Sequence, residues 1–67
     1  MLELTINGKT VSLEHSLTIA AFLSKRGIAE KMVVVEHNGV IIPRNEYGMV
    51  FLKAGDAVEI VQMMAGG

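Results

Sequence analysis

The chain has 67 residues, enough for one small domain, and a formal net charge of −1. It contains no cysteine, which excludes disulfides, thiolate metal sites and a nucleophilic thiol. The near-neutral charge and the aromatic content of 4% argue against a nucleic-acid-binding surface. Yet 51% of the residues are hydrophobic, so we expect part of the apolar surface to remain exposed for a partner.

Export and membrane insertion are not expected. The first residues lack the basic segment and apolar stretch of a signal peptide. No apolar run approaches the roughly 18 residues that a membrane span requires. Together with the absence of cysteine, these features favour a cytoplasmic location.

The first segment is predicted to be a β-hairpin. Residues 2–6 alternate between apolar and polar side chains, which is the period of a half-buried strand. Asn7-Gly8 follows, a pair typical of type I′ turns because both residues tolerate positive φ. Residues 10–14 resume the alternation and should form the returning strand.

A helix is predicted next, over residues 18–25. Ser16 or Thr18 can supply the N-cap oxygen. Ile19, Phe22 and Leu23 lie at helical spacings. Gly27 is placed to adopt the left-handed conformation that ends a helix.

The remaining chain is predicted to be mostly strands. Residues 32–36 are β-branched and apolar enough for a central strand, and His37-Asn38-Gly39 should form a second turn. Pro43 cannot donate to a ladder, so the strand before it should lie at a sheet edge or end there. The other expected segments are a strand at 40–42, a loop with one helical turn at 44–49, a short strand at 50–52 and a last strand at 57–62.

The predicted order is β-β-α-β-β-β, an α+β architecture. One helix covering one face of a mixed sheet of four or five strands satisfies the rule that domains pack in layers. We therefore expect one folded domain over residues 1–62, followed by a flexible tail over residues 63–67.

The tail ends in Gly66-Gly67. Because glycine has no Cβ, such an arm is thin and can adopt almost any φ/ψ, so it could enter a narrow channel. An α-carboxylate at its tip has an ordinary pKa of about 3.5 and is ionised at neutral pH. Another enzyme could activate this carboxylate, although chain termini are also often simply frayed.

The order of motifs resembles that of the ThiS family, the small sulfur carrier proteins of thiamin biosynthesis, which have the ubiquitin-like β-grasp fold. The resemblance covers nearly the whole chain, and its specificity lies in the order of motifs combined with the ending. The motifs are Asn7-Gly8, Val35-Glu36-His37-Asn38-Gly39-Val40, Pro43-Arg44, Leu52, Gly55-Asp56, Val58-Glu59-Ile60-Val61 and Gly66-Gly67.

The resemblance implies a carrier rather than an enzyme. An adenylating partner similar to ThiF would use ATP and magnesium to convert the Gly67 carboxylate to an acyl-adenylate. Sulfur from a cysteine persulfide on other proteins would replace AMP and leave a thiocarboxylate. A thiazole synthase similar to ThiG would receive the sulfur. This chain itself would bind no cofactor, and it has no glycine-rich phosphate loop after a strand.

Several residues are candidates for threading or docking. Gly66 and Ala65 would pass into the partner. Many family members have another glycine or a small residue where Ala65 stands; Ala65 is small enough to pass but makes the tail slightly stiffer than glycine would. Val61, Met63 and Met64 could form an apolar docking strip or close the core. Arg44 and Glu59 could meet charged partner residues or remain solvated. His15 and His37 lack a third ligand in an obvious pattern, so no metal site is expected.

Three competing functions stay open beside that of a thiazole sulfur carrier. The small subunit of molybdopterin synthase also uses a diglycine thiocarboxylate, but such chains tend to be longer and often carry Pro-Pro before the glycines. Here Gln62-Met63-Met64-Ala65 occupies that place. A ubiquitin-like modifier would conjugate its terminus to lysines, and a plain β-grasp interaction module would make no chemical use of its ending.

Overall fold

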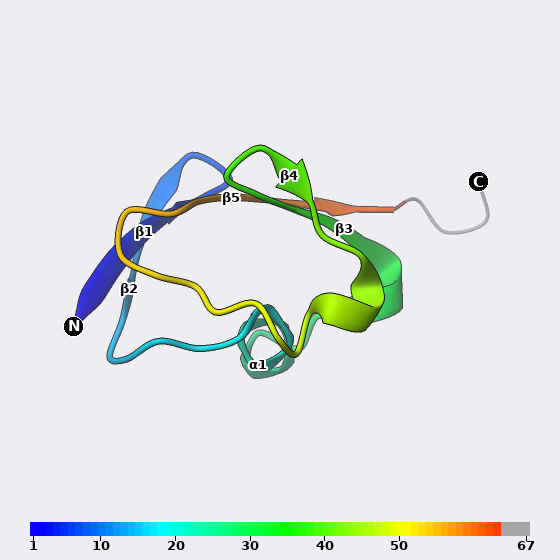
Figure 1. Cartoon of the computed structure of the whole chain (residues 1–67), viewed down its shortest axis with the longest axis horizontal. Helices are drawn as coiled ribbons and strands as arrows, with labels where there is room; N and C mark the ends of the chain where they lie inside the picture. Colours follow the sequence, from blue (N-terminus) through cyan, green and yellow to red (C-terminus); the bar gives the residue numbers. More distant parts are fainter. Residues whose placement is uncertain (64–67) are drawn as a thin grey trace.

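The computed structural model describes residues 1–63, which form a five-stranded sheet with one α-helix beneath it (Figure 1). The strand order is β2-β1-β5-β3-β4, so β5 is the middle strand. β1 and β5 are parallel, and the other neighbours are antiparallel. The elements are β1 (Leu2–Ile6), β2 (Lys9–Leu13), α1 (Ile19–Lys25), the 3₁₀-helix η1 (Glu30–Met32), β3 (Val33–His37), β4 (Val40–Ile41), the 3₁₀-helix η2 (Arg44–Glu46) and β5 (Ala57–Gln62).

Both predicted Asn-Gly turns are confirmed. Asn7 has a φ of 52° and Gly8 a φ of 81°, and Asn38 and Gly39 have values of 52° and 86°. Successive positive φ values are those of a type I′ turn, whose twist matches that of the strands it joins. The second turn leads into the two-residue edge strand β4, as the position of Pro43 predicted.

The predicted helix is confirmed, and it begins one residue later than predicted, as α1 (Ile19–Lys25). Thr18 is the N-cap, and its Oγ1 accepts a hydrogen bond from the Ala21 N–H at 3.0 Å. Gly27 has a φ of 70°, and the Ile28 N–H donates to the Leu23 carbonyl at 2.9 Å. Within residues 1–63, no helix is long and apolar enough to span a membrane.

One hydrophobic core lies between the helix and the inner face of the sheet. The inward face of α1 supplies Ile19, Phe22 and Leu23. Alternate residues of the strands oppose them, because successive strand side chains point to opposite faces. The loop between η2 and β5 closes the core with Leu52, and Tyr47 lies at the end of η2. The buried set is Leu4, Ile6, Ile19, Phe22, Leu23, Val33, Val35, Tyr47, Leu52 and Val58.

The predicted strand at residues 50–52 is wrong. This segment makes only an isolated bridge between Phe51 and Thr18. Its two backbone hydrogen bonds go to the start of the helix: the Ile19 N–H donates to the Val50 carbonyl at 3.0 Å, and the Leu52 N–H donates to the Leu17 carbonyl at 2.8 Å. The segment therefore anchors the N-terminus of α1 and does not join the sheet.

The predicted strand at 32–36 begins and ends one residue later, as β3. Met32 belongs to η1, whose turn is closed by a hydrogen bond from the Met32 N–H to the Ala29 carbonyl at 3.0 Å. β3 lies between β5 and β4, so it is an interior strand, as its apolar composition predicted.

Candidate functional site

β5 is the strand that leads to residues 64–67, and it is paired with β3 along most of its length and with β1 at its start (Figure 1). On one side it pairs with β3 through five residue pairs, from Val33↔Gln62 to His37↔Val58. On the other side it pairs with β1 at Thr5↔Ala57 and Ile6↔Val58. A strand fixed on both sides gives the segment that follows a defined point of departure.

Two asparagine side chains hold β5 further. Asn7 Oδ1 accepts a hydrogen bond from the Ile60 N–H at 2.7 Å, and Asn7 Nδ2 donates to the Ile60 carbonyl at 3.2 Å. This side-chain amide acts as one more peptide unit, extending the pairing of β1 with β5 past the end of β1. At the start of β5, Asn38 Oδ1 accepts from the Ala57 N–H at 2.8 Å.

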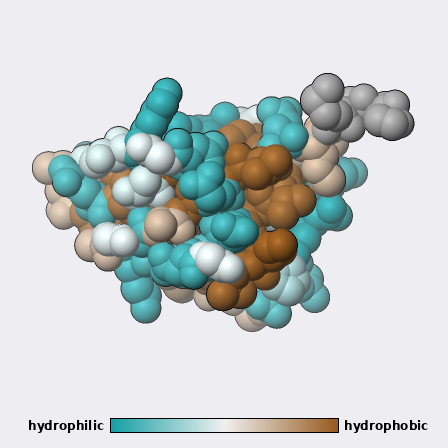
Figure 2. Space-filling model, turned by 90° about the horizontal axis from the view of Figure 1, so that it is seen from above, coloured by the Kyte–Doolittle hydropathy of each residue, from teal (hydrophilic) through white to brown (hydrophobic). Residues whose placement is uncertain are grey.

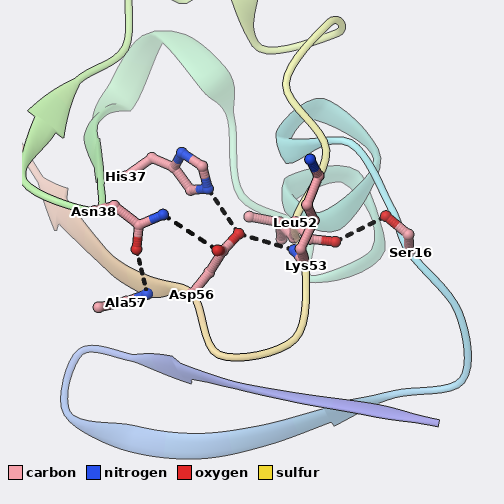
Figure 3. Close-up of polar contacts among 7 residues, drawn as sticks. All are labelled: Ser16, His37, Asn38, Leu52, Lys53, Asp56 and Ala57. Atoms are coloured by element: carbon pink, nitrogen blue, oxygen red, sulfur yellow. Dashed lines mark hydrogen bonds and ion pairs between the residues drawn. The ribbon is translucent and has the colours of Figure 1, made fainter.

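Asp56 ties the β3–β4 turn to the turn before β5 (Figure 3). Its Oδ2 lies 2.7 Å from His37 Nε2 and accepts from the Lys53 N–H at 2.8 Å, while its Oδ1 accepts from Asn38 Nδ2 at 3.1 Å. Partial burial acts to raise the pKa of Asp56, but the hydrogen bonds from His37, Lys53 and Asn38 outweigh it and hold this pKa below its ordinary value. Asp56 is thus a structural turn residue.

Replacing Asp56 with asparagine should lower the free energy of unfolding at neutral pH by about 1–3 kcal/mol, because it removes a carboxylate that accepts three hydrogen bonds. A depressed folded-state pKa contributes stability above the unfolded pKa of about 3.9 and loses it as the pH falls through the folded pKa. Asp56→Asn should therefore flatten the fall in stability below about pH 4.

Urea unfolding at a series of pH values measures this effect. The control is Glu14→Gln, which alters an exposed carboxylate that makes no ion pair within residues 1–63. Asp56 has no stabilising role if its variant keeps the neutral-pH stability and the acid dependence of the wild-type protein.

Among residues 1–63, the last backbone hydrogen bond at the exit of β5 runs from the Met63 N–H to the Met32 carbonyl at 2.8 Å. It continues the β3–β5 ladder by one residue and fixes the direction in which the chain leaves the sheet. Met64, Ala65, Gly66 and Gly67 lie outside the described residues. Their predicted roles in docking, threading and chemistry remain predictions.

Four apolar residues on the outer face of the sheet, away from α1, form what we call the outer-face patch: Val34, Ile41, Val61 and Met63. Val61 is 59% exposed and Met63 40%, so these two do not close the core. Val34 pairs with Val61 across the β3–β5 ladder. Figure 2 looks onto this face and shows apolar side chains gathered in the half toward which β5 runs.

Two carboxylates lie beside the outer-face patch. Glu36 and Glu59 are paired directly across β3 and β5, and neither makes an ion pair within residues 1–63. Like charges in this arrangement are destabilising, so a cation from a partner would relieve their repulsion. Glu59 points away from the helix-covered face.

Arg44 is separate from this group. It is exposed at the start of η2, where its carbonyl accepts from the Tyr47 N–H at 3.1 Å. η2, yellow-green in Figure 1, lies in the half of the molecule toward which β5 runs. Arg44 is therefore placed to contact a partner that surrounds this end, but it is not part of the outer-face patch.

The family model described as the ThiS family matches residues 4–67. The chain belongs to the ThiS family. The matched region includes Gly66 and Gly67, the last three residues of β1 and all of the other four strands.

Curated relatives of this ThiS-family chain fall into two groups. The sulfur carrier protein ThiS of Bacillus subtilis is 37% identical over 65 residues, covering 96% of this chain and 98% of the relative. A thiazole synthase of Paramagnetospirillum magneticum is 36% identical over 66 residues, and one of Magnetococcus marinus is 32% identical over 66 residues. The chain spans only 20% of the length of either thiazole synthase.

Solved structures confirm the predicted ubiquitin-like β-grasp fold. The crystal structure of the thiamine biosynthesis protein ThiS from Geobacter metallireducens aligns with a TM-score of 0.83 at 36% identity, covering 98% of this chain and 100% of the other. An NMR solution structure of a thiamine biosynthesis protein from the same organism gives a TM-score of 0.79 at 38% identity, covering 98% and 88%.

The sequence alone did not identify three residues of the outer face of the sheet: Val34, Glu36 and Ile41. Val34 lies within a continuous apolar run, which gave no sign that one face of its strand is exposed. Ile41 and Glu36 join the outer face through pairings of β3 with β4 and β5. Only the alternation of side chains, applied once the register is known, assigns them to that face.

Proposed function

We propose that this ThiS-family chain is the sulfur carrier for thiazole formation in thiamin biosynthesis, with the Gly67 carboxylate as its reactive group. The match of the family model through Gly66 and Gly67 is the observation that carries this proposal. The geometry supports it, because β5, the strand that precedes the glycines in the sequence, is held by β3 on one side and by β1 and the Asn7 amide on the other. A rigid body with a slim terminus suits a protein substrate that other enzymes must recognise and modify.

The chemistry begins with a poor electrophile, the carboxylate. Its oxygen attacks the α-phosphorus of ATP on an adenylating partner, and pyrophosphate leaves with magnesium neutralising its charge. The terminal sulfur of a protein persulfide then attacks the acyl carbon and AMP departs. A second thiol breaks the resulting acyl disulfide, is itself oxidised to a disulfide, and releases the thiocarboxylate.

This chain contributes no catalytic group to these steps. It has no cysteine to carry sulfur as a side-chain thiol or persulfide, so the main-chain terminus is the group that can be loaded. The nucleotide site, magnesium and persulfide belong to the partners. The role of this chain is to present the terminus and to be recognised through its folded surface, in the cytoplasm where these enzymes act.

Thiazole synthase is the proposed acceptor of the sulfur. Two curated thiazole synthases contain a segment similar to almost the whole of this chain, which indicates that the carrier fold and this enzyme work together. No comparable observation favours molybdopterin synthase. The residues before the glycines are also Gln62-Met63-Met64-Ala65, where small subunits of molybdopterin synthase often have Pro-Pro.

Reconstitution tests the proposed function. The full chain is loaded by an adenylating enzyme with ATP and a persulfide donor, and is then added to thiazole synthase or to the large subunit of molybdopterin synthase. We expect sulfur to enter the thiazole product and not molybdopterin. Transfer only to molybdopterin would contradict the proposed acceptor. Conjugation to lysines would instead show a protein modifier.

Docking should depend on the outer-face patch. Val61→Asp places a charge in this patch and beside Glu59, so we expect binding to the adenylating enzyme to weaken about tenfold or more. Thr10→Asp is the matched control, because it adds the same charge to the outer face on β2, away from the patch. Calorimetric titration measures both affinities, and equal losses would show that the patch has no special role.

A further inference from the structure

The side of β5 that faces β1 is left open at its C-terminal end. The β3–β5 ladder alternates, with the Asn38 N–H bonded to the Ala57 carbonyl and the Met63 N–H bonded to the Met32 carbonyl. This alternation turns the N–H and carbonyl of Gln62 away from β3. On the other side, strand pairing ends at Val58 and the Asn7 amide covers only Ile60.

Gln62 therefore presents one backbone donor and one acceptor with no partner within residues 1–63. Unpaired groups at a strand edge are a template for another strand. The opening at Gln62 is two residues past Ile60, which the Asn7 amide covers, and directly before Met63, so a strand added here would run beside the chain as it leaves the domain. Peptide recognition by strand addition uses such an edge together with nearby side-chain pockets.

A pocket of about 540 Å³ lies beside this edge, on the helix side of the sheet. Phe22, Ile28, Met32 and Ile60 supply apolar lining, and Gln62 lies at its border. A strand pairing with Gln62 would direct alternate side chains toward the helix side. The pocket could therefore accept an apolar side chain from an added strand.

The ionisable side chain at the pocket is positively charged. Arg26 is the one ionisable side chain among the described residues that line it, and its Cζ lies 4.8 Å from the centroid of the Phe22 ring. Arg26 makes no ion pair within residues 1–63. A guanidinium held over an aromatic ring at the pocket favours a carboxylate on the occupant, with which it can form a bidentate pair.

From these features we infer that the open edge of β5 at Gln62 binds an extended segment of thiazole synthase by strand addition. The segment offers backbone groups to Gln62, an apolar side chain to the pocket and an aspartate or glutamate to Arg26. This inference rests on the proposed function, since it names a contact with the proposed sulfur acceptor. The contact would fix the exit of β5 relative to thiazole synthase. It is separate from the outer-face patch, through which the chain is proposed to bind the adenylating enzyme.

Gln62→Pro tests the edge directly. Proline removes the one N–H offered to an added strand and leaves the bonds between β5 and β3 intact, a position where strands tolerate proline. We expect the Kd of the full chain for thiazole synthase, measured by calorimetry, to rise about tenfold or more. Gln62→Ala keeps the N–H and should stay within about threefold of the wild-type Kd.

A second pair of variants tests the pocket even if the proline variant fails to fold. Arg26→Gln and Lys25→Gln each remove one cation from the end of α1, but only Arg26 lines this pocket. Arg26→Gln should raise the Kd about fivefold or more at low salt and less at high salt, while Lys25→Gln should change it less than about twofold.

Equal changes of Kd for Gln62→Pro and Gln62→Ala would overturn the inference, as would equal changes for Arg26→Gln and Lys25→Gln. So would wild-type affinity of Gln62→Pro for the synthase. Thiocarboxylate formation by the adenylating enzyme is measured on the same proteins. If the wild-type chain is loaded and binds the synthase, and the variants bind it equally well, then only the proposed strand addition at Gln62 is refuted. Wild-type chain that is neither loaded nor bound refutes the proposed function as well.

Discussion

Deletion of Gly67 should abolish thiocarboxylate formation. The deletion retracts the terminal carboxylate by roughly 3.5 Å, the reach of one extended residue. A displacement of even 1 Å from the reactive geometry can cost about a hundredfold in rate, so loading should fall by at least about that factor. Addition of one residue after Gly67 should have an equal effect, because it moves the carboxylate past the reactive position. Intact-mass analysis after incubation with the adenylating enzyme, ATP and a persulfide donor measures loading.

The fold should be unaffected by either change. The buried core and the described hydrogen bonds lie within residues 1–63. The thermal unfolding midpoint of both variants should therefore match that of the wild-type protein. A large drop in this midpoint would show that Gly67 is packed against the domain, and normal loading would show that the position of the terminal carboxylate is unimportant.

Gly66→Val is the second change with a large expected effect. Valine adds a β-branched side chain where the proposed path into the adenylating enzyme requires a slim and adaptable backbone. We expect the rate of adenylation, followed by pyrophosphate release, to fall about a hundredfold or more. The folded domain should again keep its stability.

Gly48→Val is the matched control for this variant. Gly48 does not adopt a left-handed φ, and a Cβ built there meets no atom within 4 Å. The same substitution in the folded domain should therefore leave adenylation close to the wild-type rate. Normal adenylation of Gly66→Val would mean that the terminus does not pass through a narrow channel.

Local chemistry made much of the fold predictable. The positive φ values at Asn7 and Asn38, the Thr18 cap and the Gly27 stop each follow from the preferences of one or two residues. The segment at 50–52 was mispredicted because its backbone partners are Leu17 and Ile19, which lie more than thirty positions earlier. No local pattern reveals that such a segment pairs with a helix start instead of a sheet.

The candidate site shows the same division. Glu59 and Val61 lie on the same face because side chains alternate along β5, and this alternation can be read from the local sequence. The two hydrogen bonds between the Asn7 side chain and the Ile60 backbone were not predictable, since the two residues are 53 positions apart and meet only when β1 and β5 align. The open edge at Gln62 is likewise a consequence of register, because it depends on where β1 stops along β5.

The central claim is that sulfur is carried on the main-chain carboxyl of Gly67. Fragmentation mass spectrometry of the intact, loaded protein tests it most directly. We predict that the mass gained by exchanging one oxygen for one sulfur appears in every fragment containing Gly67 and in no fragment ending before it. Sulfur on an internal residue, or no gain of mass after incubation with a cognate adenylating enzyme, ATP and a persulfide donor, would contradict the claim.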